Sequence, residues 1–327
     1  MTLRRKWPGR ASAGLRWIIS AAAMALIVLL FPRLVDVPAA LRAVQQSDWR
    51  LDVLASLAFV AGLLAYAQRW RLLLAGKPGL GETFQAANAG HAANILLPFR
   101  AGEALRVAML GRAAALPLAE ITASVVVERG IEQAMRVLAL AGALVTGLRL
   151  ELAPAALIGV GGTLLLLTWF AAWALGHQAD ILAQGPRLLA RLPRLSEARA
   201  RQGLAAALAG INDAAASGQI RRALGWSVIT WSCFWAFQML TLAALNGAGL
   251  ATSSWAALCL GALFIAPPSA ATQPGIYHAA LVAPLALLGF DRAGLTAWAV
   301  MLHLQQMLWM IGLALVGSGL QVIRRAI

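Results

Sequence analysis

The chain of 327 residues is 61% hydrophobic and has a mean hydropathy of +0.74, values that exclude an ordinary soluble domain with a solvated surface. Its formal net charge is +14, but the basic residues lie in short segments beside long apolar runs, which favours cytoplasmic membrane flanks over a nucleic-acid surface. Cys233 and Cys259 lie in apolar segments, so neither a disulfide framework nor a paired-cysteine metal site is indicated. We therefore expect a polytopic membrane protein.

The first half of the chain, residues 15–148, is expected to contain three full spans. The apolar run 17–31 follows a basic segment, and we interpret it as an uncleaved span because many further spans follow it. A second apolar run, 51–74, returns inward, and the run 117–148 crosses outward again.

Two segments flank the second of these spans. In residues 32–50 apolar and charged residues recur at helical spacing, which predicts an amphipathic helix on the outer face of the membrane. Arg69, Trp70 and Arg71 end the span, and Lys77 follows them. Aromatic rings beside cations are typical of a membrane–water interface, so we predict that these residues anchor the helix end there.

Residues 83–112 form two apolar halves, each shorter than the about 20 residues that a spanning helix needs. Pro98 lacks an N–H group and Gly102 tolerates unusual backbone angles, so we predict a helix that breaks near Pro98 and restarts near Gly102. The segment favours a re-entrant hairpin from the cytoplasm, whose restarted helix exposes N–H groups with partial positive charge. Between its two apolar halves it carries Arg100, Glu103 and Arg106.

The third full span carries several charges. Glu128, Glu132 and Arg136 are four residues apart and Arg129 is three before Glu132, so their side chains share or adjoin one helix face. Charge is expensive in hydrocarbon, and this face therefore cannot point toward lipid. Two interpretations stay open for these charges and those of the hairpin: ion pairs that brace the fold, or a wet cavity that binds a substrate.

The second half, residues 155–320, repeats this order from the opposite side. A polar loop, 177–223, contains seven of the 27 basic residues, which places it in the cytoplasm and predicts amphipathic surface helices there. Prolines and Gly275 break the run 255–290, which predicts a second hairpin entered from outside. The full spans of this half are 155–176, 224–245 and 295–320.

The order span, span, hairpin, span thus occurs twice with inverted orientation in one membrane domain of residues 1–327. The predicted fold is an all-α polytopic membrane protein with six full spans and two opposed re-entrant hairpins. On this topology 18 basic residues lie inside, five outside and four within the membrane, which supports cytoplasmic N- and C-termini in an inner cell membrane. In transporters, paired breaks in inverted halves point to a site near the midplane.

Motifs in and around the two hairpins also match a known pattern. They are Arg69-Trp70, Asn94 with Leu97-Pro98, Arg100-Ala101-Gly102-Glu103 with Arg106, Glu128-Arg129, and Pro274-Gly275-Ile276-Tyr277-His278. With them the chain resembles the flippase-like membrane domain of lysylphosphatidylglycerol synthases and its stand-alone relatives, some of them linked to hopanoid, polyisoprenoid or glycolipid pathways. The sequence departs from the family at Glu132, where Asp is expected, and lacks a further glycine in the second hairpin.

The soluble aminoacyl-transferring domain of those synthases is not found in these residues, so the resemblance implies lipid translocation or display rather than lysyl transfer. We predict a lipid flippase or transporter in which Arg100, Arg106 and Arg129 hold an anionic headgroup such as a phosphate, and neighbouring glutamates position them or take a proton. The predicted substrate-binding residues are Asn94, Arg100, Gly102, Glu103, Arg106, Glu128, Arg129, Glu132, Gln273, Gly275, Tyr277 and His278.

Two alternatives from other classes stay open. One is a membrane-embedded transferase with Glu103 or Glu128 as general base, and the other is an accessory subunit whose loop 177–223 recruits a lipid-synthesis enzyme. No metal or cofactor is expected, because the four histidines lack ligand spacing and no nucleophile elbow or phosphate-binding loop occurs. The predicted partner is a membrane lipid or a polyisoprenoid, hopanoid or glycolipid substrate, and no nucleic acid.

Overall fold

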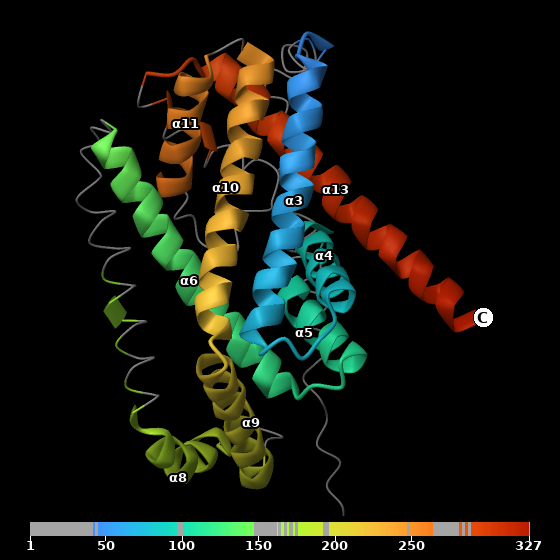
Figure 1. Cartoon of the computed structure of the whole chain (residues 1–327), viewed down its shortest axis with the longest axis vertical. Coiled ribbons are helices and arrows are strands. Elements are labelled where there is room, and N and C mark those ends of the chain that lie inside the picture. The colour runs from blue at the N-terminus through green and yellow to red at the C-terminus, as the bar shows by residue number, and fades with distance from the viewer. Residues whose placement is uncertain are drawn as a thin grey trace, which may run out of the picture.

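A computed structural model describes residues 45–96, 101–146, 176–191, 196–246, 249–263 and 289–326 as continuous stretches, with a few further positions between 42 and 286. Every element in these stretches is an α-helix (Figure 1). The helices are α3 (Trp49–Leu73), α4 (Leu80–Leu96), α5 (Ala101–Ala113), α6 (Leu118–Val145), α8 (Gln178–Leu189), α9 (Glu197–Ala216), α10 (Gln219–Asn246), α11 (Leu250–Leu263) and α13 (Arg292–Ala326). The predicted all-α class is confirmed for the described part of the chain.

Three helices are long and apolar enough to cross a membrane: Trp49–Leu73, Gln219–Leu245 and Gly294–Gly317. They coincide with three of the predicted spans. Large apolar side chains on them remain exposed, for example Leu57 at 60% and Leu308 at 70%. An apolar surface of this kind needs lipid to cover it, and the protein is therefore a multi-pass helical membrane protein.

The ends of α3 follow local sequence signals. The Asp48 carboxylate accepts a hydrogen bond from the backbone N–H of Arg50 at 2.9 Å, which caps the helix start. At the other end Ala75 and Gly76 take positive φ angles of 54° and 74°, and the Gly76 N–H group donates to the Arg71 carbonyl. This left-handed turn stops α3 and leads the chain into α4.

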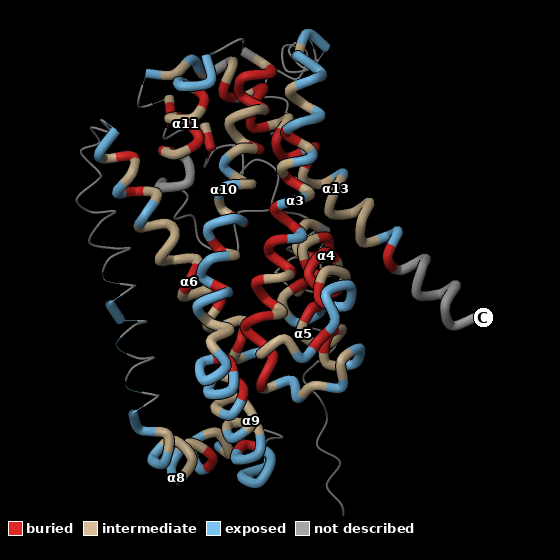
Figure 2. The backbone as a smooth tube through the Cα atoms, in the orientation of Figure 1, coloured by how far each residue is buried: buried red, intermediate tan, exposed pale blue. Residues whose placement is uncertain are grey.

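The largest helix contact joins α3 to α10 along their length, with α13 packed beside them (Figure 1). The Phe59 ring of α3 lies 4.8 Å from the Phe237 ring of α10, and the Trp298 indole of α13 donates to the Gln238 carbonyl at 3.0 Å. Buried positions gather along α3, α4 and α11, while α9 is more exposed (Figure 2). One apolar cluster therefore joins the three candidate spans to α6 and α11, and a second joins α3 to α4, α5 and α6.

In the segment 83–112 the structure describes two short helices, of which α4 ends at Leu96 and α5 begins at Ala101, beside the predicted restart near Gly102. Pro98 and Arg100 lie outside the described residues. The Asn94 carboxamide oxygen accepts a hydrogen bond from the Gly102 N–H at 2.8 Å, so the end of α4 caps the start of α5. The entry of this helix pair from one face of the membrane stays a prediction.

Helices α8 and α9 occupy the polar loop, as the sequence predicts. Helix α9 packs on α6, and Lys77 links this contact to the turn after α3, because its ammonium lies 2.7 Å from Glu120 and 3.1 Å from Asp213. The hydrogen bond to Glu120 and, less strongly, that to Asp213 raise the pKa of Lys77. Lys77 thus forms ion pairs that connect α6 and α9, and it is not a free anchor at the membrane interface.

The remaining predicted elements lie wholly or mainly outside the described residues. They are the spans 17–31 and 155–176, most of the amphipathic segment 32–50, and most of the second hairpin, in which α11 covers residues 255–263. The described helices therefore support the membrane class without testing the number of spans.

The contact between α4 and α5 gives a stability prediction. A Cβ atom added at Gly102 would collide with the carbonyl oxygen of Gly90, which is backbone and cannot turn away. We expect Gly102→Ala to lower the free energy of unfolding by about 1–3 kcal/mol, the usual cost of overpacking. Thermal unfolding of the purified protein in detergent measures this.

The matched control is Gly81→Ala on α4, where an added Cβ meets open space. It should cost nothing. Equal stability of the two variants would contradict the close approach of α4 and α5.

Candidate functional site

Six charged side chains from α3, α5 and α6 meet in the interior of the protein. Three are arginines and three are glutamates, so their formal charges cancel. They are Arg69, Glu103, Arg106, Glu128, Arg129 and Glu132, and we call them the charge ring.

Glu128 is fully inaccessible to solvent. Its carboxylate lies 3.2 Å from Nη1 of Arg106 and 3.7 Å from Nη2 of Arg69. The hydroxyl of Tyr66 donates to it at 2.5 Å and in turn accepts a hydrogen bond from Arg106. Two guanidinium groups and a phenol thus satisfy one buried carboxylate.

The other two glutamates complete the ring. Glu132 lies 2.9 Å from both Arg69 and Arg129, and Glu103 pairs with Arg106 at 2.7 Å and closely with Arg129. Each carboxylate therefore contacts two arginines, and each arginine contacts two carboxylates. The order around the ring is Arg69, Glu128, Arg106, Glu103, Arg129, Glu132 and back to Arg69.

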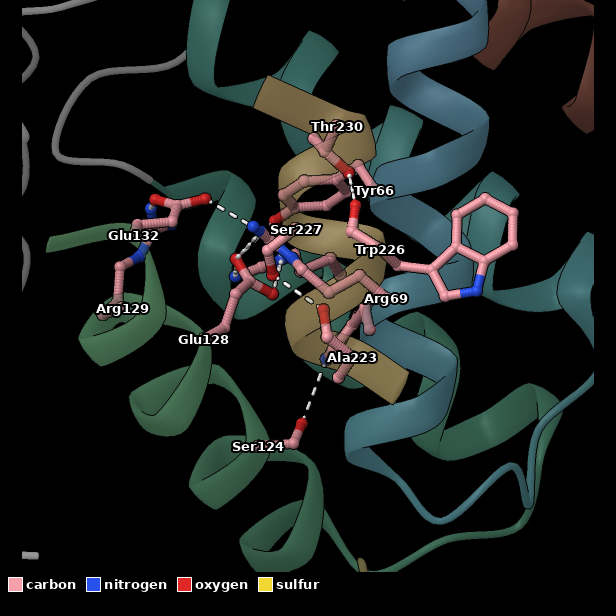
Figure 3. A network of polar contacts seen from close by, with 12 residues as sticks. Tyr66, Arg69, Ser124, Glu128, Arg129, Glu132, Ala223, Trp226, Ser227 and Thr230 are labelled. Atoms are coloured by element: carbon pink, nitrogen blue, oxygen red, sulfur yellow. Dashed lines mark hydrogen bonds and ion pairs between the residues drawn. The ribbon is translucent and has the colours of Figure 1, made fainter. Parts of the chain in front are cut away.

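Helical spacing brings together the members of the charge ring on α3 and α6 (Figure 3). On α6 Glu128 and Glu132 are four residues apart and share a face, and on α3 Tyr66 and Arg69 are three apart on the facing surface. Trp70 follows on the same face, stacks on the Arg106 guanidinium at 4.7 Å and donates from its indole to Ser124 at 3.0 Å. An aromatic side chain thus contacts the charge ring in addition to the carboxylates that belong to it.

The prediction that Arg69 and Trp70 anchor the helix end at the membrane interface is wrong. Both side chains are fully buried, because this face of α3 is turned toward the glutamates of α6. If Arg69 pointed toward the membrane interface instead, the glutamates of α6 would lose this cationic partner. Sequence reasoning also missed Tyr66, although its spacing of three from Arg69 marks one polar patch on an apolar helix.

The ring contains five of the predicted site residues, and two more, Asn94 and Gly102, join α4 to α5. The bracing interpretation therefore describes the geometry of these charges, and substrate binding by them stays a prediction. Arg106 is 2% exposed, and all its nitrogens contact Glu103, Glu128 or Tyr66. The predicted residues outside the described ranges are Arg100, Gln273, Gly275, Tyr277 and His278.

A cavity of about 410 Å³ adjoins the ring between α3, α6, α10 and α11, and we call it the α6–α10 cavity. Aromatic and aliphatic side chains form most of its wall. Among the lining residues Leu138 is 63% exposed, Val228 54% and Trp235 38%, so the cavity lies beside an apolar surface. Its charged lining residues are Arg69, Glu132 and Arg136.

The polar groups of this cavity carry an excess of donors. Within the described ranges Arg136 forms no ion pair with a carboxylate, and its hydrogen bond goes to the neutral Gln133 side chain at 3.0 Å. Nε and Nη1 of Arg69 are buried and have no hydrogen-bond partner among the described residues. Buried unpaired donors and an uncompensated cation favour an anionic ligand.

The ring predicts a large effect of one substitution. Glu128→Gln removes the carboxylate shared by Arg69 and Arg106, and breaking a buried pair costs about 3–5 kcal/mol of unfolding free energy. Denaturant titration of the purified protein measures this. Glu197→Gln is the control, since its pair with Arg187 is exposed and long at 3.7 Å, and similar midpoints for both variants would show that the ring is not structural.

Comparison with known proteins agrees with the resemblance carried by the motifs. The family model described as the lysylphosphatidylglycerol synthase TM region matches residues 17–314, which include all of α3 to α11 and most of α13. Neither the curated proteins nor the solved structures compared give a match. The chain belongs to the family of the lysylphosphatidylglycerol synthase transmembrane region.

Proposed function

We propose that this protein moves an anionic membrane lipid between the two leaflets and binds its headgroup in the α6–α10 cavity. Membership of the family connects the chain to membrane lipids. The observation that carries the proposal is the cavity itself, which combines unpaired arginine donors with an apolar wall. Such a composition suits an amphiphile with a negative headgroup.

The headgroup would lie against Arg136 and the free donors of Arg69. A guanidinium matches the oxygen geometry of a phosphate, and the pairing removes the cost of an uncompensated cation in a low-dielectric site. The exposed apolar residues Leu138, Val228 and Trp235 would border the acyl or isoprenoid chain, which stays in the bilayer. The polar headgroup alone would then leave the lipid phase.

The charge ring would couple this cavity to the helix pair α4–α5. Glu132 belongs to both the ring and the cavity wall, so an anion at Arg69 competes with a ring carboxylate. Arg129, with a side chain 38% exposed, would be the next cation to receive it. This proposal also includes the other predicted binding residues, the six full spans, the two opposed hairpins and the inner-membrane location with cytoplasmic termini.

The transport prediction concerns Arg136. Because this residue forms no ion pair with any described residue, we expect Arg136→Gln to keep the fold and to lower the translocation rate of an anionic phospholipid at least tenfold. Arg136→Lys should restore it only in part, since an ammonium lacks the guanidinium fork. Leaflet accessibility of a fluorescent phosphatidylglycerol in reconstituted vesicles gives the rate.

The control for this change is Arg112→Gln, which removes an exposed arginine of α5 and so makes the same change in net charge. It should translocate as the unchanged protein does. If Arg136→Gln were equally active, the headgroup would not bind in this cavity.

The topology prediction follows from the distribution of basic residues. Reporter fusions after residues 77, 200 and 325 should report inside, and those after 40, 151 and 250 outside. An outside signal after residue 200 would overturn the topology, because the loop 177–223 carries its strongest orientation signal.

A further inference from the structure

A second cavity, of about 680 Å³, lies where α3 ends and α10 begins. Both helices are candidate spans, so these two adjacent ends mark one surface of the membrane. Among the described residues the cavity shares no lining residue with the α6–α10 cavity. We call it the interfacial cavity, and its polar lining residues are Gln68, Arg71, Gln219 and Arg222.

The charge of this cavity is positive and uncompensated within the described residues. Arg71 comes from α3 and Arg222 from α10, no acidic residue lines the cavity, and neither arginine forms an ion pair in the described part of the chain. Nε of Arg71 donates to the Pro78 carbonyl at 2.9 Å, which holds this side chain in place. Lys77, by contrast, is neutralised by two carboxylates.

The rest of the lining is suited to an amphiphile. The side-chain oxygen of Gln219 is buried and has no hydrogen-bond partner among the described residues, so it offers an acceptor to a hydroxyl group. One and two turns along α10 from Arg222 lie Trp226 and Ile229, and Ile229 is 46% exposed. Along α10 a polar acceptor, a cation and an apolar surface thus follow one another away from the helix start.

We propose that the interfacial cavity binds an anionic glycerophospholipid of the surrounding membrane, with its phosphate between Arg71 and Arg222 and its acyl chains along Trp226 and Ile229. Basic cavities between transmembrane helices are suited to such headgroups. The bound lipid bridges α3 and α10, the two helices with the largest contact. This site is separate from the proposed transport site and does not depend on translocation.

The site is tested by lipid binding to the full-length protein in detergent. Native mass spectrometry and thermal shift follow titration with dioleoyl phosphatidylglycerol and, as the neutral comparison, dioleoyl phosphatidylcholine. The protein carries Arg136→Gln throughout, so that the other cavity contributes no free cation. We expect phosphatidylglycerol to bind at least tenfold more tightly and to raise the unfolding temperature.

Two kinds of variant locate the site. Arg71→Gln and Arg222→Gln should each weaken phosphatidylglycerol binding at least fivefold, whereas Arg221→Gln, a neighbouring exposed arginine outside the cavity, should not. A side chain at Gly225 meets open space and fills the cavity, so Gly225→Leu should block binding without straining the helix. Gly81→Leu is its control on α4, where the space is also open.

Three results would overturn the proposal. One is equal affinity for the two lipids. Another is unchanged lipid binding in both the Arg222→Gln and the Gly225→Leu proteins, because neither substitution removes the hydrogen bond from Arg71 to the Pro78 carbonyl. The third is displacement of the lipid by an equal concentration of inorganic phosphate, which would assign the cavity to a soluble anion.

Discussion

The described structure depends on the balance of six charges in its interior. Moving a guanidinium or a carboxylate out of water costs several kcal/mol even after relaxation. The charge ring offsets this cost because arginines and glutamates alternate around it. Every charge has two opposite neighbours, and the sum is zero. Since its members come from α3, α5 and α6, the ring also fixes how the α4–α5 pair meets the candidate span α3. Removal of any member leaves two partners unbalanced.

One turn beyond Glu132, Arg136 breaks this balance. Its charge has no carboxylate partner among the described residues, and it lines a cavity together with the unpaired donors of Arg69. In the proposed function the charge ring braces the helices and Arg136 binds the anion, two tasks that the sequence pattern merges. Glu132 would connect the two tasks, because an anion that pairs with Arg69 weakens the contact between Arg69 and Glu132. The packing of α6 against α3 would then change.

Helical spacing and local signals were enough to predict much of this arrangement. They predicted the restart of the helix near Gly102, the shared face of Glu128 and Glu132, and the helices of the polar loop. The partner of that face was not predictable, since Arg69 is 59 residues from Glu128 and an arginine beside a tryptophan at a helix end reads as an interface anchor. Composition near a helix end does not tell which face turns inward. For the same reason the ion pair between Lys77 and Asp213 could be identified only from the structure.

Helix α10 separates the two cavities. Arg222, Gly225, Trp226 and Ile229 follow the i, i+3, i+4, i+7 pattern of one stripe and line the interfacial cavity, whereas Val228, Trp231 and Trp235 form a second stripe on the α6–α10 cavity. Both cavities are also lined by α3, through residues near Arg71 and through Arg69. A shift of α10 against α3 therefore changes both volumes together. A lipid held at the membrane surface would bias the position of α10, and with it the cavity proposed for the transported headgroup.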